Sequence, residues 1–195
     1  MIRGLNSGKS MTPEYLDRLK QAIDQFPYSE IHRVCERLKA GWKERRSFFL
    51  CGNGGSAGNS IHLANDFLYG AGVGAGRGLA VESLASNSAV LTCLANDLGY
   101  EDVFSEQLRV KAVEGDMLWI MSGSGNSPNV IRAAEIGSAL NLDVVAIVGF
   151  DGGILKNVCE TVVHFRVDDM QVAEDMQLIV GHYCMKWLSK NLQRS

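Results

Sequence analysis

A histidine and an aspartate stand four residues apart, directly after a glycine-rich segment. The segment is GNGGS at residues 52–56, and the pair is His62 and Asp66. Residues four apart on a helix project from the same face one turn apart, so the two side chains can share a metal ion or a substrate. A solvent-exposed ion pair has the same spacing. Chemistry is favoured because this helix would begin at the glycine-rich turn.

A second loop, SGSGNS at residues 122–127, is rich in hydroxyl groups and precedes Pro128. Ser127 suits a helix N-cap and Pro128 the first helical position, so free N–H groups at a helix N-terminus would face the loop. One such loop is as typical of an ordinary strand-to-helix turn as of a phosphate site, but two such loops favour a phosphate site. Neither loop matches GxxxxGK[ST] or GxGxxG, so a small phosphomonoester is expected rather than a nucleoside triphosphate or a dinucleotide.

The C-terminal segment contributes Glu174 and His182, eight residues apart. On a helix they would be separated by about 80° and roughly 12 Å, so they could converge only on a group lying between them. His182 lies in an apolar stretch, where a structural core histidine is the ordinary interpretation. The third glycine-rich segment, residues 70–78, would follow a helix and precede a strand. That order is the reverse of the dinucleotide-binding one, so we expect a mobile surface loop that could border the site.

Short apolar runs alternate with helical segments along most of the chain. Continuous hydrophobicity indicates strands buried on both faces, and the alternation indicates βαβ crossovers, so the expected fold is a three-layer αβα sandwich around a five-stranded parallel sheet. The predicted strands are 47–51, 79–83, 117–121, 143–149 and 161–167, and the last helix spans about 172–193. Ligands bind at the carboxyl ends of such strands, where both loops fall.

Residues 12–46 predict a pair of helices before the first strand, with Thr12 as N-cap and Pro13 at the first position. Apolar residues recur at helical spacing in both halves, and FPYS at 26–29 separates them. The pair either packs on another subunit or only covers the sheet. Both interpretations stay open.

The composition favours one soluble domain over residues 1–195. The chain is 46% hydrophobic and 21% charged, with a net charge of −3 that argues against a broad nucleic-acid surface. Five widely spaced cysteines without a CxxC pair are typical of reduced thiols, which predicts a cytoplasmic protein. No signal peptide or membrane-spanning run is expected.

Together these segments resemble the phosphoheptose (sedoheptulose-7-phosphate) isomerases of the SIS, or sugar isomerase, superfamily. The resemblance is carried by the first loop with its His and Asp, by LTCLANDLGYEDVFSEQL at 91–108, by EGDMLWIMSGSGNSPNVIRA at 114–133 and by the last helix with His182. It covers nearly the whole chain. It implies a flavodoxin-like SIS domain with a helical extension at 1–46 and an αβα core at 47–195.

The resemblance also implies a homotetramer that interconverts a ketose phosphate and an aldose phosphate through an enediol, at sites on subunit boundaries. The pathway would be surface polysaccharide precursor synthesis. A divalent metal, often zinc, would be bound by His62, Asp66, Glu174 and His182. The substrate-binding positions would be Asn53, Gly54, Gly55, Ser56, Asn87, Ser122, Gly123, Ser124, Ser127 and Glu174.

The chemistry assigns Asp66 as the base and His182 as its acid/base partner, because moving a proton between adjacent carbons needs one group for the proton and one for the oxygens. Four residues depart from the family pattern: Asp66 replaces Glu, Glu174 replaces Gln, Asn87 replaces Asp and Gly123 replaces Thr. Two histidines and two carboxylates remain, which favours an altered but active site over an inactive one. The alternative is a non-catalytic SIS domain that senses a sugar phosphate or binds a replication initiator protein.

Overall fold

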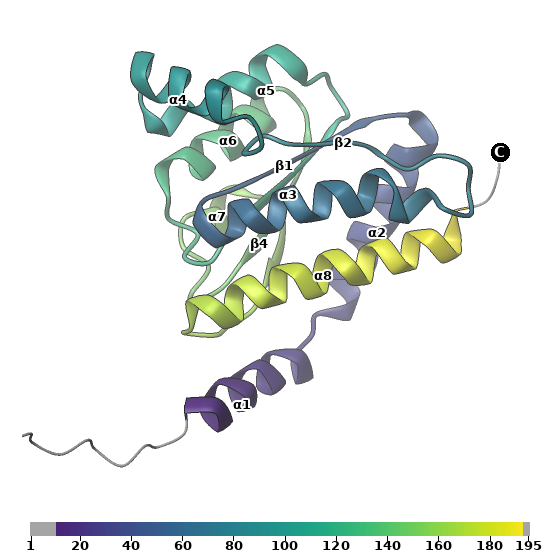
Figure 1. The fold of residues 1–195 in the computed structure, drawn as a ribbon, viewed down its shortest axis with the longest axis vertical. Coiled ribbons are helices and arrows are strands. Elements are labelled where there is room, and N and C mark those ends of the chain that lie inside the picture. Colours follow the sequence, from purple (N-terminus) through teal and green to yellow (C-terminus); the bar gives the residue numbers. More distant parts are fainter. Residues whose placement is uncertain (1–10, 193–195) are drawn as a thin grey trace, which may run out of the picture.

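The computed structural model describes residues 11–192, with side chains from residue 14 onward. Its centre is one five-stranded sheet in the order β2-β1-β3-β4-β5, in which every neighbouring pair is parallel (Figure 1). This confirms the predicted sheet. The strands are β1 (Ser47–Gly52), β2 (Ala80–Ser83), β3 (Met117–Ser122), β4 (Asp143–Val148) and β5 (Thr161–His164).

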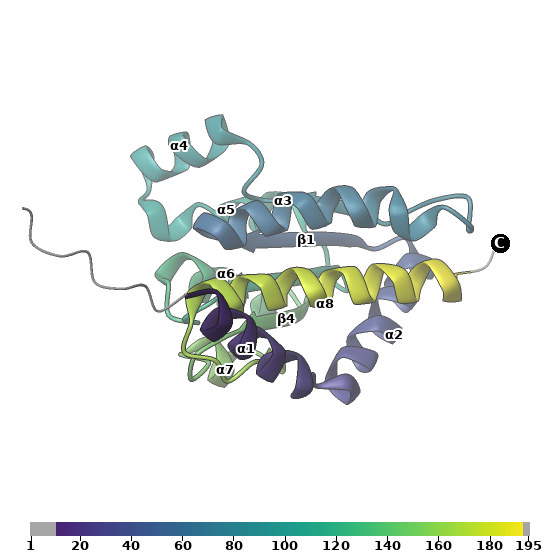
Figure 2. The ribbon, with the colours of Figure 1, turned by 60° about the horizontal axis from the view of Figure 1, so that its bottom comes forward.

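Helices cover both faces of the sheet, which gives the predicted three layers (Figure 2). The helices are α1 (Met11–Asp24), α2 (Tyr28–Glu44), α3 (Gly54–Leu68), α4 (Ser88–Asp97), α5 (Ser105–Lys111), α6 (Pro128–Ala139), α7 (Leu155–Val158) and α8 (Met170–Asn191), with short 3-10 turns η1 (Gly70–Gly72) and η2 (Tyr100–Asp102). The cluster with α2, α3 and α8 lies on one face, and the cluster with α5, α6 and α7 on the other.

Successive strand residues alternate between these two cores. Phe48 and Leu50 belong to the first cluster, whereas Phe49 and Cys51 belong to the second, and all four are buried. Side chains alternate faces along a strand, so a continuous apolar run is what a sheet covered on both sides requires.

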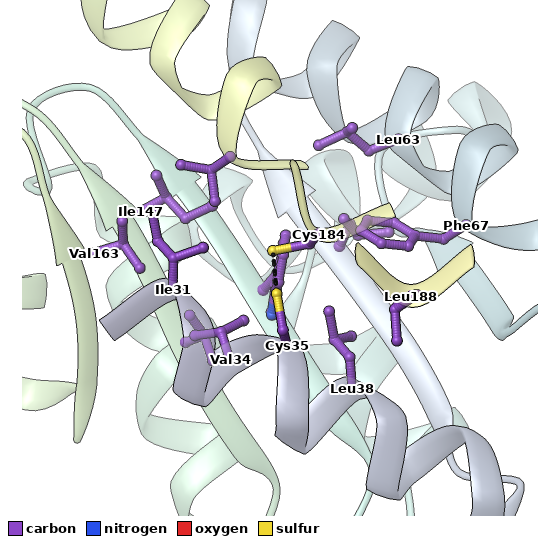
Figure 3. Packing of buried hydrophobic residues seen from close by; sticks show 14 of the residues in the cluster. Ile31, Val34, Cys35, Leu38, Leu63, Phe67, Ile147, Val163, Cys184 and Leu188 are labelled. Carbon is purple, nitrogen blue, oxygen red and sulfur yellow. Dashed lines mark hydrogen bonds between the residues drawn. The ribbon is translucent and has the colours of Figure 1, made fainter. Parts of the chain in front are cut away.

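The N-terminal helix pair is present and covers the sheet from the α8 side. Ile31, Val34 and Leu38 of α2 are fully buried, and Cys35 Sγ lies 3.5 Å from Cys184 Sγ of α8 (Figure 3). Helix α1 begins at Met11, so the predicted cap Thr12 falls inside the helix. Residues 1–10 and 193–195, including both ends of the predicted domain, lie outside the described residues.

The glycine-rich segment 70–78 lies at the surface, where Val73 is 64% exposed, but it is also packed in part. Ala71 and Ala75 are buried, and the segment packs near Met185 in the last turns of α8. Because it precedes β2, it lies at the amino end of that strand, away from the edge where the two loops meet (Figure 1). Gly70 follows Asp66 by four residues and faces Met185, which follows His182 by three, so a border between this segment and the site stays a prediction. Within residues 11–192, no helix is both long and apolar enough to cross a bilayer.

Candidate active site

The first loop is a single residue between β1 and α3. Asn53 has an extended backbone (φ −112°, ψ 154°) and stands at the N-cap of α3, yet its side chain makes no capping hydrogen bond. The first N–H groups of α3 therefore remain available to an anion at the carboxyl edge of the sheet. Ser56, in the first turn of α3, is buried.

The Asn53 side chain is instead held by two residues that sequence reasoning did not single out. Asn53 Nδ2 donates to Asn129 Oδ1 at 2.8 Å, and Asn129 Nδ2 donates back to Asn53 Oδ1 at 2.8 Å. The Tyr100 hydroxyl also donates to Asn53 Oδ1, at 3.0 Å. Asn129 is buried on α6, so this amide pair ties the first loop to the helix that follows the second. The only sequence signal was the position of both residues within the segments quoted for the resemblance.

The second loop connects β3 to α6 as predicted. Ser127 is the N-cap and Pro128 the first helical residue, although the Ser127 side chain makes no capping hydrogen bond. The Ser122 hydroxyl accepts the Gly125 N–H at 3.1 Å, and the Ser124 hydroxyl accepts the Asn126 N–H at 3.3 Å. Two serine side chains thus shape the loop, and Ser127 keeps its hydroxyl for a ligand.

The two loops enclose one hollow of about 250 Å³. Six of its ten lining residues carry polar side chains, and two are methionines. Its lining residues are Asn53, Gly54, Ser56, Met121, Ser122, Gly123, Ser124, Ser127, Met170 and Glu174. Eight of the ten substrate-binding positions implied by the resemblance therefore meet here, Glu174 among them. A space of this size suits a phosphate group and the sugar atoms next to it.

His62, Asp66 and His182 converge on one point, as predicted. His62 Nε2 lies 3.0 Å from His182 Nε2, and Asp66 Oδ2 lies 3.6 Å from the first nitrogen and 3.3 Å from the second. The Asp66 carboxylate is 20% exposed, and both imidazoles face solvent on one side. His182 is therefore not a structural core histidine.

The convergence depends on how closely α8 approaches α3. The two helices lie side by side and run in the same direction (Figure 1), with Gly55 facing Glu174, Asn59 facing Gln177 and Leu63 facing Gly181. A Cβ on Gly181 would lie 2.3 Å from Leu63 Cδ2. Only a glycine permits this contact, and it brings the neighbouring His182 to His62 and Asp66.

The donor set fits a zinc ion. Ligands about 2.1 Å from a tetrahedral zinc lie roughly 3.4 Å from one another, and the three donor–donor distances of 3.0, 3.3 and 3.6 Å bracket that value. Two imidazoles and one carboxylate, within 4.8 Å of one another, leave a fourth position for substrate, the pattern of catalytic rather than structural zinc sites.

Glu174 does not join these three residues among the described groups that could hold a metal. Its carboxylate lies against Gly55 in the first loop, where a Cβ on that glycine would be 2.2 Å from Glu174 Oε2. Asn59 Nδ2 donates to the Glu174 carbonyl oxygen at 2.9 Å and fixes this position along α8. Glu174 thus borders the hollow between the two loops, and its role as a metal ligand stays a prediction.

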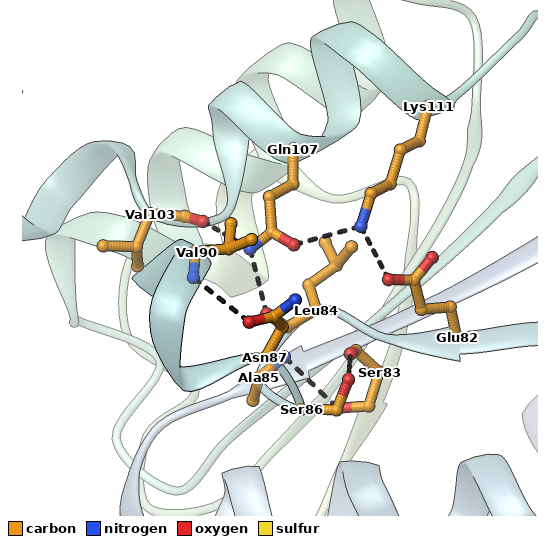
Figure 4. A network of polar contacts seen from close by, with 10 residues as sticks. All are labelled: Glu82, Ser83, Leu84, Ala85, Ser86, Asn87, Val90, Val103, Gln107 and Lys111. Atoms are coloured by element: carbon orange, nitrogen blue, oxygen red, sulfur yellow. Dashed lines mark hydrogen bonds and ion pairs between the residues drawn. The ribbon is translucent and has the colours of Figure 1, made fainter. Parts of the chain in front are cut away.

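Asn87 is the N-cap of α4, where its Oδ1 accepts the N–H groups of Ala89 and Val90 at 3.1 and 3.2 Å (Figure 4). The segment just before it is fixed by the buried Gln107, whose Nε2 donates to the Leu84 and Val103 carbonyl oxygens. The side-chain oxygen of Asn87 therefore already has a structural role. Its substrate-binding role also stays a prediction.

Gly123 faces Met170, the first residue of α8. A Cβ at Gly123 would lie 2.3 Å from Met170 Sδ, so the thioether fills the space that a larger residue in the loop would take. A threonine at this position would clash with Met170, so Gly123 and Met170 are compatible with each other where Thr and Met170 would not be.

A model of the family described as SIS domain matches residues 14–149. A phosphoheptose isomerase of Helicobacter pylori (strain Shi470) is 33% identical over 183 residues, which is 93% of each chain. One of Akkermansia muciniphila is 36% identical over 166 residues, 84% of each chain. The solved structure of phosphoheptose isomerase from Neisseria gonorrhoeae superposes with a TM-score of 0.85 over 92% of this chain and 97% of that one, at 24% identity. This last likeness shows the shared fold.

Proposed function

The chain belongs to the SIS-domain family and, within it, to the phosphoheptose isomerases, and we propose that it converts sedoheptulose 7-phosphate into a heptose 7-phosphate aldose, or handles a close relative. The conversion passes through an enediol and serves surface polysaccharide precursor synthesis. The observation that carries the proposal is the meeting of His62, Asp66 and His182 on the helix pair whose starts border the phosphate hollow.

The two loops bind the phosphate. The N–H groups at the starts of α3 and α6 and the hydroxyls of Ser56 and Ser127 present donors to the hollow from two sides. The Asn53–Asn129 pair keeps the loops at a fixed separation. Binding here leaves the other end of the sugar to extend along α3.

The distance along α3 supports a long sugar. From Ser56 to His62 the helix rises about 9 Å, at 1.5 Å per residue. An extended chain gains about 1.2 Å per bond, so the seven bonds from the carbonyl carbon C2 of a heptulose 7-phosphate to phosphorus span roughly 8 Å. The three corresponding bonds of a triose phosphate span only about 4 Å. A heptose phosphate can therefore reach both ends of the site.

Asp66 takes the proton from the carbon beside the carbonyl and returns it to the neighbouring carbon, while His182 gives a proton to the carbonyl oxygen and receives one from the adjacent hydroxyl. The shorter carboxylate still reaches the site, because the glycine contact brings His182 Nε2 to 3.3 Å from Asp66 Oδ2. His62 packs edge-on against His182, with ring centroids 5.2 Å apart, and orients its partner.

We further propose that His62, Asp66 and His182 bind a divalent metal, zinc by the donor set, through one atom each, which leaves Asp66 its second carboxylate oxygen and His182 its second ring nitrogen for the proton transfers. Bound there, it supplies Lewis-acid stabilisation of the negative oxygen that develops during enolisation.

The alternative function is that of a non-catalytic SIS domain, which binds a phosphosugar or a protein without catalysing a reaction. Such a domain needs the phosphate hollow but not three converging titratable side chains beyond it. The cluster therefore favours the enzyme.

We propose a homotetramer in the cytoplasm as the working form, with residues 1–195 as one domain. Support for assembly comes from apolar surface: α4 has no buried residue although it is rich in apolar side chains, and Ile61, Leu68 and Tyr69 are exposed on and beside α3. Support for the compartment comes from the five cysteines, which are all free thiols.

The test is isotope exchange in D₂O. Sedoheptulose 7-phosphate incubated with the protein should gain deuterium at the carbon beside the carbonyl, whereas Asp66→Asn and His182→Ala should lose the exchange. A pentulose and a hexulose phosphate should exchange more slowly because they are shorter. Phosphosugar binding without exchange on any of the three would reject the enzyme in favour of the non-catalytic SIS domain.

A further inference from the structure

The Glu174 carboxylate lies beside the first turn of α3, in the lining of the hollow where we propose that phosphate binds. An ideal Cβ on Gly55 would lie 2.2 and 2.5 Å from its two oxygens, so the carboxylate rests directly against the second residue of α3. Glu174 also lines the hollow formed by the two loops. An acidic side chain therefore stands inside a pocket whose other polar groups are arranged for phosphate.

Helix polarity explains why the carboxylate lies there. The start of α3 presents free N–H groups and the positive end of the helix dipole, which favours a negative group close by. Within residues 11–192, no hydrogen bond or ion pair holds the Glu174 carboxylate in place. Such a contact is weak, so another anion can replace the carboxylate.

A phosphate dianion and a carboxylate cannot share this position, because like charges a few ångströms apart repel. We propose that Glu174 is an internal competitor for the first loop, which a phosphate group must displace to bind. Glu174 then sets how tightly the site holds phosphate, and so is a specificity-determining residue. The inference rests on the proposed phosphate role of the two loops.

A buried donor lies about one helical turn along α8 from Glu174, and we infer that it receives the displaced carboxylate. Gln177 is 1% exposed, and its Nε2 has no hydrogen-bond partner in the part of the chain that the structure describes. Its Oε1 accepts Asn59 Nδ2 at 3.0 Å, and since the same nitrogen donates to the Glu174 carbonyl oxygen, the Gln177 amide cannot be reversed.

Glu174 and Gln177 are three residues apart on α8, and side chains at that spacing are neighbours on one helix face. A carboxylate that leaves Gly55 can accept this unpaired N–H. Glu174 thus has two positions, one against Gly55 without phosphate and one at Gln177 with it.

The experiment measures binding of inorganic phosphate to the intact protein by calorimetry at equal zinc content. Glu174→Gln keeps the shape and removes the charge, so phosphate should bind about tenfold more tightly, the effect of deleting one partly screened like charge nearby. Glu135→Gln is the matched control: it makes the same substitution on the exposed surface of α6 and should leave phosphate affinity unchanged.

A double-mutant cycle tests the second position. Gln177→Met removes the donor, so the carboxylate returns to Gly55 more readily and phosphate should bind about threefold more weakly. In the Glu174→Gln background the same change should have no effect, because the two residues act through each other. Thermal unfolding of each variant separates loss of binding from loss of fold.

Equal phosphate affinity for wild type and Glu174→Gln would overturn this inference alone. So would a loss of zinc affinity in Glu174→Gln with phosphate unchanged, which would make the residue a metal ligand. An absence of phosphate binding in both proteins would overturn the phosphate role of the loops as well. The D₂O exchange on the sugar phosphate then decides whether the proposed isomerase activity holds even though the loops do not bind phosphate.

Discussion

Gly181→Ala should disturb the site from the contact between α3 and α8. The added Cβ would lie 2.3, 2.5 and 2.9 Å from three carbons of Leu63, which is fully buried and cannot move into open space. Helix α8 must then shift away from α3 at the residue next to His182. The variant introduces no polar group and touches no candidate catalytic side chain.

The cost follows from packing. An extra methyl in a full core costs about 1–3 kcal/mol, and the better helix propensity of alanine returns about 1 kcal/mol, so a net loss of up to roughly 2 kcal/mol in the free energy of unfolding is expected. A shift of about 1 Å between His182 and Asp66 should slow exchange by roughly 100-fold.

The assay pairs urea unfolding with the D₂O exchange rate on sedoheptulose 7-phosphate. Gly58→Ala is the matched control, because it lies on the exposed side of α3 and its Cβ would meet nothing within 4 Å. The same substitution should there raise the free energy of unfolding by about 0.5–1 kcal/mol and leave exchange unchanged.

Leu63→Ala supplies the rescue. Alone it should cost about 2–5 kcal/mol through the cavity that it leaves. Combined with Gly181→Ala it gives the new methyl room, so the double variant should be more stable than the two single costs predict and should exchange faster than Gly181→Ala alone. Wild-type stability and exchange in Gly181→Ala would refute the claim that this contact sets the site.

Three further outcomes are expected. Asn129→Asp cannot donate to Asn53 Oδ1, so it should lower the free energy of unfolding by about 1–3 kcal/mol and weaken phosphate binding. Thermal unfolding and calorimetry measure the two effects. Unchanged values would contradict the role of the Asn53–Asn129 pair in linking the two loops. The hydrogen bond from Tyr15 to Asp175 raises the pKa of Tyr15 from 10.0 to about 12. The stability that it adds, under about 1 kcal/mol after solvent screening, is therefore present below pH 10 and lost as the pH rises through 12; Tyr15→Phe should lack this loss, and absorbance at 295 nm should show one tyrosine ionising late. Leu68→Glu places a charge on an exposed apolar position and should shift the assembly to smaller species in light scattering, whereas an unaltered mass would exclude that surface from the interface.

Much of the fold follows from local pattern. Phe48 to Cys51 and Leu118 to Ile120 are continuous apolar runs because strands covered on both sides need an apolar residue at every position. Loop residues such as Ser127 and Pro128 could be placed because N-caps and first-turn prolines have short-range causes. For the segment 70–78, glycine content predicted a surface loop but not the burial of Ala71 and Ala75, which depends on tertiary packing.

The sequence by itself determined the strands, the two loops and the face on which His62 and Asp66 lie, since these depend on residues a few positions apart. It left His182 and Glu174 ambiguous, because helical spacing gives an angle and a rise but no neighbour. Tertiary structure decided both: the contact of Gly181 with Leu63 brings His182 to His62 and Asp66, and the hydrogen bond from Asn59 holds the backbone of Glu174 beside the first loop. The register between two helices more than a hundred residues apart in the chain depends on packing, and no local pattern contains it.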